Sequence, residues 1–459
     1  MTKKFYIETY GCQMNVADSE VVASILCKAG YEPAKDIHSA DLILVNTCSI
    51  RENAEQRVWG RLDLFRSEKR KRPQVVVGVL GCMAERLKEK LLESDKMVDL
   101  VAGPDAYREL PVLVTSAGEG HKAVNVLLSR EETYADIAPV RLESNGVSAF
   151  ISIMRGCNNM CAYCVVPYTR GAERSRNPET IVKEAAEIFD QGYREVTLLG
   201  QNVDSYSWKT ADGTIGFAQL LAMVAEVNSK LRIRFSTSHP KDLSDEVLYT
   251  MSRYDNICKH IHLPVQSGSS EVLKRMNRKY DRPWYMDRLN AINRILPGCS
   301  VSTDIISGFC GETEEEHEET LSLMREAGFD FAYMFKYSER PGTRAARHLS
   351  DDIPEKVKTQ RLNEIISLQN ELSAISKKAD IDKIFEVLVE GKAKKAIAGR
   401  EAIENVANLP HDTARISTMM GRTSGNKVVV FQAFNTRPGD YVNVKVVSAT
   451  SATLIGEVL

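Results

Sequence analysis

The sequence predicts an α/β fold in three parts: an N-terminal parallel α/β sandwich, a central partial (β/α)6 barrel of TIM type, and a small antiparallel β-barrel at the C-terminus. Short apolar runs alternate with stretches of helical character through most of the chain, as in parallel sheets covered by helices. After a long helical pattern at 354–378, only short strand-like segments follow. The 459 residues allow about three domains, which we place at 1–130, 145–378 and 380–459.

The N-terminal part alternates four apolar runs with helical patterns. We expect helices at 18–29 and 54–70, and strands at 5–11, 41–49, 75–82 and 99–105. Alternation of this kind indicates a parallel sheet with helices on its faces. Residues 129–148 are polar, contain Pro139 and Gly146, and are expected to form a linker.

The alternation restarts in the central part. Strands are expected at 150–156, 195–201, 232–238, 260–266, 300–309 and 331–337, with helical patterns such as 178–191 and 314–327 between them. Six strand–helix units indicate an open, partial barrel. The short strand candidates of the last part, at 384–390, 427–431, 441–447 and 453–458, indicate a small all-β module.

Composition narrows the protein class. The hydrophobic fraction is 43%, the charged fraction is 27% and the net charge is −2, so RNA contacts would need a local basic patch. The N-terminus lacks the apolar stretch of a signal peptide, and the most apolar run, 75–84, is about half a membrane span. We therefore expect a cytoplasmic protein without membrane contact. In a reducing compartment, its ten cysteines indicate metal binding or chemistry rather than disulfides.

One cysteine group is compact. Cys157, Cys161 and Cys164 form a C-x3-C-x2-C loop after the first predicted barrel strand. One loop of this spacing can wrap a [4Fe–4S] cluster, and three thiolates leave one iron open. That iron can chelate S-adenosylmethionine (SAM), from which an electron yields a 5′-deoxyadenosyl radical. The alternative is a zinc knuckle, but zinc usually needs four ligands, and the nearest downstream histidine is His239.

A second cysteine group is spread along the chain. Cys12, Cys48 and Cys82 each follow an apolar strand, with separations of 36 and 34 residues, about one βαβ unit each. Successive parallel strands bring their carboxyl ends to one edge, so the three thiols should converge on a second open-iron cluster able to hold sulfur. The alternative is three buried structural cysteines. The remaining cysteines are taken as structural or left unassigned: Cys27, Cys258, Cys299 and Cys310.

Several stretches carry a resemblance to a known family. They are 10–15 (YGCQMN), 46–49 (NTCS), 154–176 (MRGCNNMCAYCVVPYTRGAERSR), 198–206 (LLGQNVDSY), 262–269 (HLPVQSGS) and 337–343 (YSERPGT). Together they resemble the methylthiotransferases, a family of radical SAM enzymes, over nearly the whole chain, including a C-terminal RNA-binding TRAM β-domain. One departure is Cys310, where the family usually has proline.

The resemblance is strongest to the tRNA-modifying branch. It implies addition of a methylthio group to C2 of N6-isopentenyladenosine at tRNA position 37. One SAM would be the methyl donor and a second the radical source, and two [4Fe–4S] clusters would each have three cysteine ligands. The implied partners are the tRNA anticodon stem-loop, a low-potential electron donor, and a protein for sulfur delivery or cluster repair.

Further site residues are implied by likeness to radical SAM cores. The aromatic Tyr163, beside the last cysteine of the loop, would lie near the adenine of SAM. Residues at or near the ends of the barrel strands would also contact SAM: Gly200, Gln201, Asn202, Ser236, Gln266, Asp304 and Gly308. For each one, an ordinary polar or structural role at a strand end is the alternative. His239, His260 and His262 are expected to be core histidines.

Basic residues are the candidates for RNA contact. Arg170, Arg174 and Arg176 follow the cluster loop and are expected at the mouth of the site, since arginine suits phosphate. Lys394, Lys395 and Arg422 of the β-module would contact RNA backbone. A solvated loop is the alternative for the three arginines, and a solvated helix end is the alternative for RNA contact by the basic run at 66–72.

Three other functions remain open from the sequence. The same chemistry could act on threonylcarbamoyladenosine in tRNA or on a ribosomal protein. A third possibility is an iron–sulfur carrier or RNA-binding scaffold without catalysis, but a carrier gains nothing from an open iron.

Overall fold

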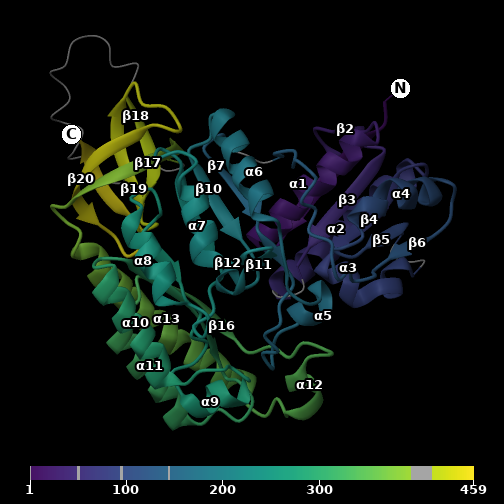
Figure 1. The fold of residues 1–459 in the computed structure, drawn as a ribbon. Helices are drawn as coiled ribbons and strands as arrows, with labels where there is room; N and C mark the ends of the chain where they lie inside the picture. Colours follow the sequence, from purple (N-terminus) through teal and green to yellow (C-terminus); the bar gives the residue numbers. More distant parts are fainter. Residues whose placement is uncertain (1, 49–51, 94–96, 143–144, 394–415) are drawn as a thin grey trace.

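The computed structural model describes residues 2–48, 52–93, 97–142, 145–393 and 416–459 (Figure 1). It contains a six-stranded sheet, two three-stranded sheets, two short two-stranded sheets and a closed barrel. The N-terminal sheet (purple to blue) and the C-terminal barrel (yellow) lie on different sides of the central part. The predicted α/β class is confirmed.

The N-terminal sheet is parallel throughout, in the order β2-β1-β3-β4-β5-β6. The predicted strands are β1 (Lys4–Tyr10), β3 (Leu42–Thr47), β4 (Val76–Gly81) and β5 (Leu100–Ala102). The sequence did not predict the edge strands β2 (Glu32–Pro33) and β6 (Ala123–Asn125), since two or three residues carry no readable pattern.

Helices cover both faces of this sheet, as a sandwich requires. On one face, α1 (Gln13–Lys28) and α4 (Leu110–Gly118) pack against β-strand residues such as Leu44. On the other, α2 (Glu52–Lys71) and α3 (Cys82–Leu87) pack against residues such as Val45. The central strands β3, β4 and β5 are therefore buried on both faces, which explains their continuous apolar runs.

The central part forms the expected open barrel of six parallel strands. Its two sheets, β13-β10-β7 and β14-β15-β16, are joined by a bridge between Ile233 and Ile257. The strands are β7 (Ser148–Ser152), β10 (Glu195–Leu199), β13 (Arg232–Ser236), β14 (His260–His262), β15 (Ser300–Ser307) and β16 (Phe331–Lys336).

The central helices are α6 (Pro178–Asp190), α7 (Phe217–Ala225), α8 (Asp245–Arg253), α9 (Ser270–Arg275), α10 (Arg282–Ile295), α11 (Glu314–Ala327) and α12 (Arg344–His348), with the long α13 (Glu355–Lys378) at the end. Three of them, α6, α11 and α13, match the helical patterns expected at 178–191, 314–327 and 354–378. A hairpin of β11 (Ser207–Thr210) and β12 (Gly213–Gly216) was not predicted. Among the described residues, no helix is long and apolar enough to cross a membrane.

The C-terminal barrel closes in the order β17-β18-β19-β21-β20. Its strands are β17 (Ile384–Lys392), β18 (Ile416–Thr423), β19 (Val428–Phe434), β20 (Tyr441–Ala449) and β21 (Leu454–Val458). The sequence did not predict β18. The expected antiparallel arrangement is confirmed for four of the strand pairs. The fifth pair, β19 and β21, which closes the barrel, runs parallel.

This small barrel sits on the amino ends of the central strands. At the start of β13, Arg232 donates to the Arg422 carbonyl oxygen at 2.8 Å and Arg234 to the Thr423 carbonyl oxygen at 2.8 Å. Tyr441 donates its hydroxyl hydrogen bond to the Arg194 carbonyl oxygen before β10 (3.1 Å). The module therefore lies at the end of the central barrel opposite to the carboxyl ends of its strands.

Two phenylalanines of β19 test the core of the small barrel. Phe431 is fully buried (0% exposed), whereas Phe434 is 55% exposed. We expect Phe431→Ala to lower the free energy of unfolding by about 3–5 kcal/mol, because it leaves a cavity. Phe434→Ala should change it by less than about 0.5 kcal/mol. Urea unfolding of the full-length protein measures both, and equal losses would contradict the assigned strand orientation.

Candidate functional site

The three N-terminal cysteines follow one row of the sheet. Tyr10, Thr47 and Gly81 are paired in register across β1, β3 and β4, and Cys12, Cys48 and Cys82 come one or two residues later. The Cys48 backbone N–H donates to the Tyr10 carbonyl oxygen at 3.0 Å. The topology thus brings the carboxyl ends of three neighbouring strands to one edge, as the sequence predicted.

The thiols interact with one another. A side-chain hydrogen bond with Cys48, together with the nearby Arg170 guanidinium, outweighs burial and lowers the pKa of Cys12 to about 6. Burial raises the pKa of Cys82, and the charge of Cys12 adds to that effect while Arg170 opposes it. Cys48 and Cys82 therefore both interact with Cys12, and the Arg170 guanidinium acts on Cys12 and Cys82.

Two buried asparagines shape this edge. Asn15 accepts a hydrogen bond from the Cys12 backbone N–H at 3.3 Å and donates to Asn46 Oδ1 at 3.3 Å. Asn46 in turn donates to the Asn15 carbonyl oxygen at 2.9 Å. Neither residue was predicted as functional, although each lies two or three positions from a cysteine within a quoted motif. They hold two of the cysteine turns together.

Glycine is required at the turn before Cys82. Gly81 has φ +87° and ψ −156°, a conformation that is essentially closed to other residues. A Cβ atom there would lie 2.3 Å from Asn46 Oδ1 and 2.8 Å from the Thr47 carbonyl oxygen. The turn is thus specified by both backbone conformation and space.

The second cysteine loop lies between β8 (Met154–Arg155) and α5 (Val166–Arg170). The Cys157 N–H donates to the Gly171 carbonyl oxygen at 3.0 Å, and the Cys164 N–H to the Cys161 carbonyl oxygen at 3.1 Å. Burial, with a smaller contribution from the neighbouring Cys161, raises the pKa of Cys157 to about 11 and that of Cys164 to about 12. The thiols are thus mutually close.

A second buried guanidinium accompanies this loop. Arg278 donates from Nη1 to Cys161 Sγ at 3.3 Å and contacts the Tyr163 hydroxyl at 3.5 Å. Each cysteine triplet therefore has a buried guanidinium beside its thiols, Arg170 in one case and Arg278 in the other, and such a cation is compatible with a thiolate-bound, anionic iron–sulfur cluster. No group of three His, Cys, Asp or Glu side chains among the described residues is arranged to hold a single metal ion.

A small apolar cluster joins the first cysteine turn to the central barrel. Met14 and Ala17 of α1 pack against Leu199, the last residue of β10, and Cys12 lies against the same cluster. Gly200 follows Leu199 directly. The first cysteine turn therefore adjoins a strand end of the central barrel.

The SAM candidates gather at the carboxyl ends of the barrel strands. Gly200, Gln201 and Asn202 follow β10, and Ser236 ends β13. The side-chain oxygens of Gln201, Asn202 and Gln266 are buried and have no hydrogen-bond partner among the described residues. Such orphan acceptors are costly unless a ligand or water satisfies them, so they fit a bound donor such as an ammonium or hydroxyl group.

The other candidates already have protein contacts. Asp304 lies 3.3 Å from His262 Nε2, and Tyr163 packs edge-on against Phe309. The Gly308 N–H donates to Glu312 Oε2 at 2.6 Å. A Cβ at Gly308 would lie 2.4 Å from Lys358 Cγ, so this glycine also serves close packing of α13.

A buried polar group beside Asn202 was not predicted. Burial raises the pKa of Asp204 to about 7, although a hydrogen bond from Ser238 opposes the shift. Burial lowers the pKa of His239 to about 2 and that of His260 to about 3. These two histidines are therefore neutral.

The expectation that Arg170, Arg174 and Arg176 line an exposed mouth is wrong. Their exposed fractions are 3%, 6% and 6%. Arg170 pairs with Asp18 at 2.7 Å, Arg174 with Asp105 at 2.9 Å, and Arg176 with Glu184. The sequence did not reveal this burial, because the partners of Arg170 and Arg174 lie more than 60 residues away along the chain.

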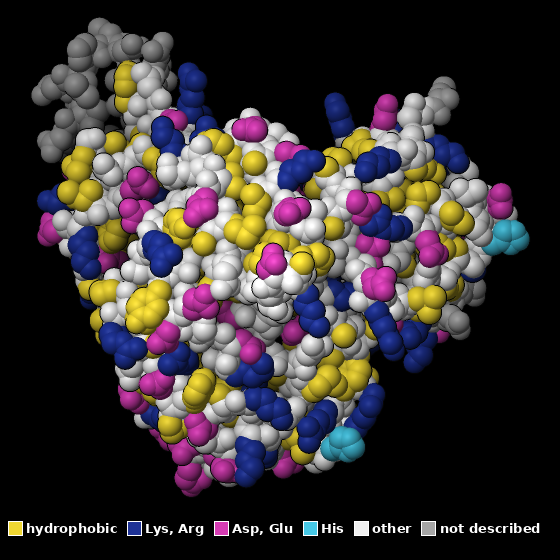
Figure 2. Space-filling model, in the orientation of Figure 1, with side chains coloured by type: hydrophobic (Ala, Val, Ile, Leu, Met, Phe, Trp, Pro, Cys, Tyr) yellow, Lys and Arg dark blue, Asp and Glu magenta, His cyan; other side chains and the backbone are white. Residues whose placement is uncertain are grey.

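The other basic candidates for RNA contact either have an acidic partner or lie outside the described residues. Arg422 pairs with Glu390 at 3.0 Å, and Lys394 and Lys395 lie outside the described residues. In the basic run of α2, Lys69 pairs with Asp99 and Lys71 with Glu68, and both of these acidic partners are buried. Figure 2 shows Lys and Arg interspersed with Asp and Glu on the face drawn.

The four unassigned cysteines show no cluster of their own. Cys258, Cys299 and Cys310 are buried and Cys27 is half-buried. Cys310, at the position of the family proline, packs with Phe309 and Tyr337.

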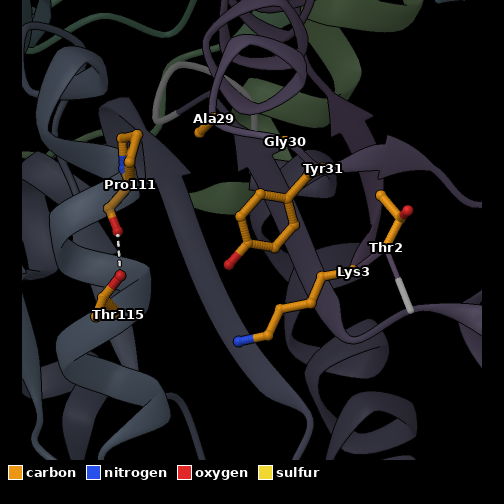
Figure 3. A pocket seen from close by; sticks show the side chains of 7 residues that line it. All are labelled: Thr2, Lys3, Ala29, Gly30, Tyr31, Pro111 and Thr115. Atoms are coloured by element: carbon orange, nitrogen blue, oxygen red, sulfur yellow. Dashed lines mark hydrogen bonds between the residues drawn. The ribbon is translucent and has the colours of Figure 1, made fainter.

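A surface hollow of about 630 Å³ lies elsewhere (Figure 3). It is lined by Lys3, Tyr31, Pro111 and neighbouring residues, at the start of β1 and the end of α1. It is therefore at the sheet edge opposite to the cysteines and forms no part of the site.

Comparisons with known proteins agree with the domain order. Residues 4–103 match "Uncharacterized protein family UPF0004", residues 151–324 the radical SAM superfamily, and residues 409–459 the TRAM domain. A solved structure of the radical SAM methyltransferase TsrM from Kitasatospora setae shares the fold, with a TM-score of 0.55 at 13% identity over 75% of this chain and 77% of that one.

Full-length relatives are much closer in sequence. A protein of Amoebophilus asiaticus named "tRNA-2-methylthio-N(6)-dimethylallyladenosine synthase" is 57% identical over 100% of this chain and 93% of its own length. Proteins of the same name from Phocaeicola vulgatus and Bacteroides thetaiotaomicron are 57% and 56% identical, each over 99% of this chain and 96% of their own length.

Gly81 offers a test of the cysteine edge, with Gly30 as its control. Both have nearly the same φ, +87° and +89°, but nothing lies within 4 Å of a Cβ at Gly30. We expect Gly30→Ala to lower the free energy of unfolding by about 1 kcal/mol. Gly81→Ala should lower it by at least about 2 kcal/mol more and reduce the iron content after anaerobic reconstitution. Normal iron loading of Gly81→Ala would contradict a cluster at this turn.

Proposed function

The chain belongs to the family of tRNA-2-methylthio-N(6)-dimethylallyladenosine synthases, and from this we propose that it adds a methylthio group to C2 of N6-isopentenyladenosine at tRNA position 37. The observation that carries the proposal is the 57% identity to a protein of that name over the whole chain. One SAM is the methyl donor and a second is the radical source. Relatives matched at this level favour this substrate over threonylcarbamoyladenosine or a ribosomal protein.

We propose that each cysteine triplet holds one [4Fe–4S] cluster. The support is the electrostatic interaction among thiols of each triplet and the buried guanidinium beside each one. When bound, the clusters and SAM supply the radical and the sulfur needed to convert a C–H bond into a C–S bond. Met14 and Leu199 pack the Cys12 turn against the end of β10, which supports a shared position for the substrate near both clusters.

The chain's own residues would orient SAM at the barrel mouth. Gln201 and Asn202 bring unsatisfied acceptors from the end of β10. Gln266 adopts φ +74° and is held there by hydrogen bonds from its N–H to the Asp304 carbonyl oxygen and from the Ile306 N–H to its own carbonyl oxygen. Strain that is held by surrounding structure is typical of ligand sites.

The other proposed SAM contacts form the rest of the pocket. Ser236 would reach the methionine or ribose part, and Tyr163, Asp304 and Gly308 would lie near the adenine. Asp304 of β15 lies 3.3 Å from His262 Nε2 of the neighbouring strand β14.

We propose the tRNA anticodon stem-loop as substrate, with the TRAM module, including Lys394, Lys395 and Arg422, contacting the RNA backbone. A low-potential electron donor and a protein for sulfur delivery or cluster repair would complete the system in the cytoplasm. We place the functional domains at 1–130, 145–378 and 380–459.

The substrate assignment is tested directly. The protein, reconstituted without oxygen, is given reductant, SAM and sulfide together with isopentenylated, threonylcarbamoylated or unmodified anticodon stem-loops, or a ribosomal peptide. We expect mass spectrometry to show a methylthio mass gain only on the isopentenylated RNA, because the adenosine must carry the group that the site recognises. A gain on the threonylcarbamoylated RNA or on the peptide instead would select another substrate.

Iron content tests the two clusters. We expect about eight irons per chain, four for each cluster. Replacing Cys157, Cys161 and Cys164 by Ala should halve the iron and abolish SAM cleavage. Replacing Cys12, Cys48 and Cys82 should also halve the iron but leave SAM cleavage measurable, because that triplet does not bind SAM. Full iron loading of the second variant would contradict the N-terminal cluster.

A further inference from the structure

Buried charges meet at the boundary between the N-terminal domain and the barrel. Asp18 of α1 accepts hydrogen bonds from Arg155 (2.8 Å) and Arg170 (2.7 Å). Asp105 accepts two from Arg174, at 2.9 and 3.1 Å, and lies 3.6 Å from the Nε of Arg155. All five side chains are at most 5% exposed.

This group carries an excess positive charge. Three guanidiniums face two carboxylates, and arginine stays protonated in proteins. The nearby Glu85 does not balance the excess, since it pairs with Lys88 at 3.5 Å. A buried charge without a counter-charge is strongly unfavourable, so the excess points to an anionic partner at this place.

A neighbouring charge group shows the contrast. Arg141 pairs with Glu20 at 2.5 Å and with Glu184 at 2.9 Å, and Arg176 also pairs with Glu184. Here two guanidiniums face two carboxylates. This group also joins the N-terminal domain to the barrel, but its positive and negative charges balance. No cysteine takes part in its ion pairs.

Arg170 is the member of the unbalanced group that faces the cysteines. Its Nη2 is engaged by Asp18, whereas its Nη1 is buried without a hydrogen-bond partner among the described residues. The charges that act on it, besides Asp18, are those of Cys82, Tyr107 and Cys12. Arg170 thus stands between the excess charge and two of the three N-terminal thiols.

We propose that Arg170 is a positioning residue for the N-terminal cluster, whose negative charge it compensates and whose reduction potential it raises. The inference rests on the proposed function, in which Cys12, Cys48 and Cys82 hold that cluster. Three thiolates around a core of charge two-plus leave one net negative charge, which matches the one excess positive charge of the arginine group. Because reduction adds a further negative charge, a nearby fixed cation favours it.

The position of Arg170 also links the two cysteine sites. It ends α5, the short helix that begins just after Cys164, and α5 packs against α3, which begins at Cys82. One segment of the barrel therefore carries a ligand of one cluster and the counter-charge of the other.

The test uses full-length protein in which Cys157, Cys161 and Cys164 are replaced by Ala, so that only the N-terminal cluster forms. Into this parent we introduce Arg170→Met, Arg170→Lys or the control Arg141→Met. The midpoint potential is read from a redox titration followed by electron paramagnetic resonance. We expect Arg170→Met to lower the ratio of reduced to oxidised cluster at a fixed potential at least tenfold. For one electron, this corresponds to a midpoint potential that is about 59 mV lower. Arg170→Lys should shift it less, and Arg141→Met should leave it unchanged.

Two results would overturn the inference. One is a midpoint in Arg170→Met equal to that of the parent, and the other is an equal shift in Arg141→Met. If Arg170→Met does not load iron, Arg170→Lys decides: loading with nearly the parent midpoint supports the charge account, and failure to load overturns it. A parent that holds no iron would contradict the N-terminal cluster itself, whereas a parent with about four irons and an unshifted Arg170→Met contradicts only the role of Arg170.

Discussion

The shared carboxylate of Asp18 is the contact on which the site depends. It sits on the first helix of one domain and holds Arg155 and Arg170 of the other. Buried ion pairs are expensive to desolvate, and their best-attested value is to fix one arrangement among several. Here the arrangement is the docking of two α/β units. The apolar contact of Met14 with Leu199 lies beside the same boundary, so packing and charge specify one relative position.

That docking places the carboxyl edge of the N-terminal sheet, through the Cys12 turn, against the end of β10 in the central barrel. Each domain alone presents three cysteines, and each has a buried arginine beside its thiols, Arg170 in one case and Arg278 in the other. Arg170 comes from the barrel but faces the N-terminal cysteines. The N-terminal triplet therefore depends on both domains for its electrostatic environment, even though one domain supplies all of its thiols.

The parts that sequence could predict are those governed by local pattern. Buried parallel strands appear as apolar runs, and thiols at the ends of neighbouring strands converge because the topology leaves no other arrangement. The short edge strands β2 and β6 carry too few residues for a pattern. The role of Arg170 was out of reach for another reason: its partner Asp18 is 152 residues away. Beside a cluster loop, an arginine that binds phosphate and one that is buried in an ion pair have the same sequence signal.

The burial of these arginines changes how RNA must approach. The TRAM module rests on the amino ends of the barrel strands, whereas the cysteines lie at the carboxyl ends. The longest barrel strand, β15, has 8 residues, which at about 3.3 Å per residue gives roughly 26 Å between these ends. An RNA held by the module at one end and delivering a base to the other must therefore run along the flank of the barrel. Recognition then depends on the length and shape of a stem-loop as well as on the base, because only an RNA that spans this distance can engage both ends.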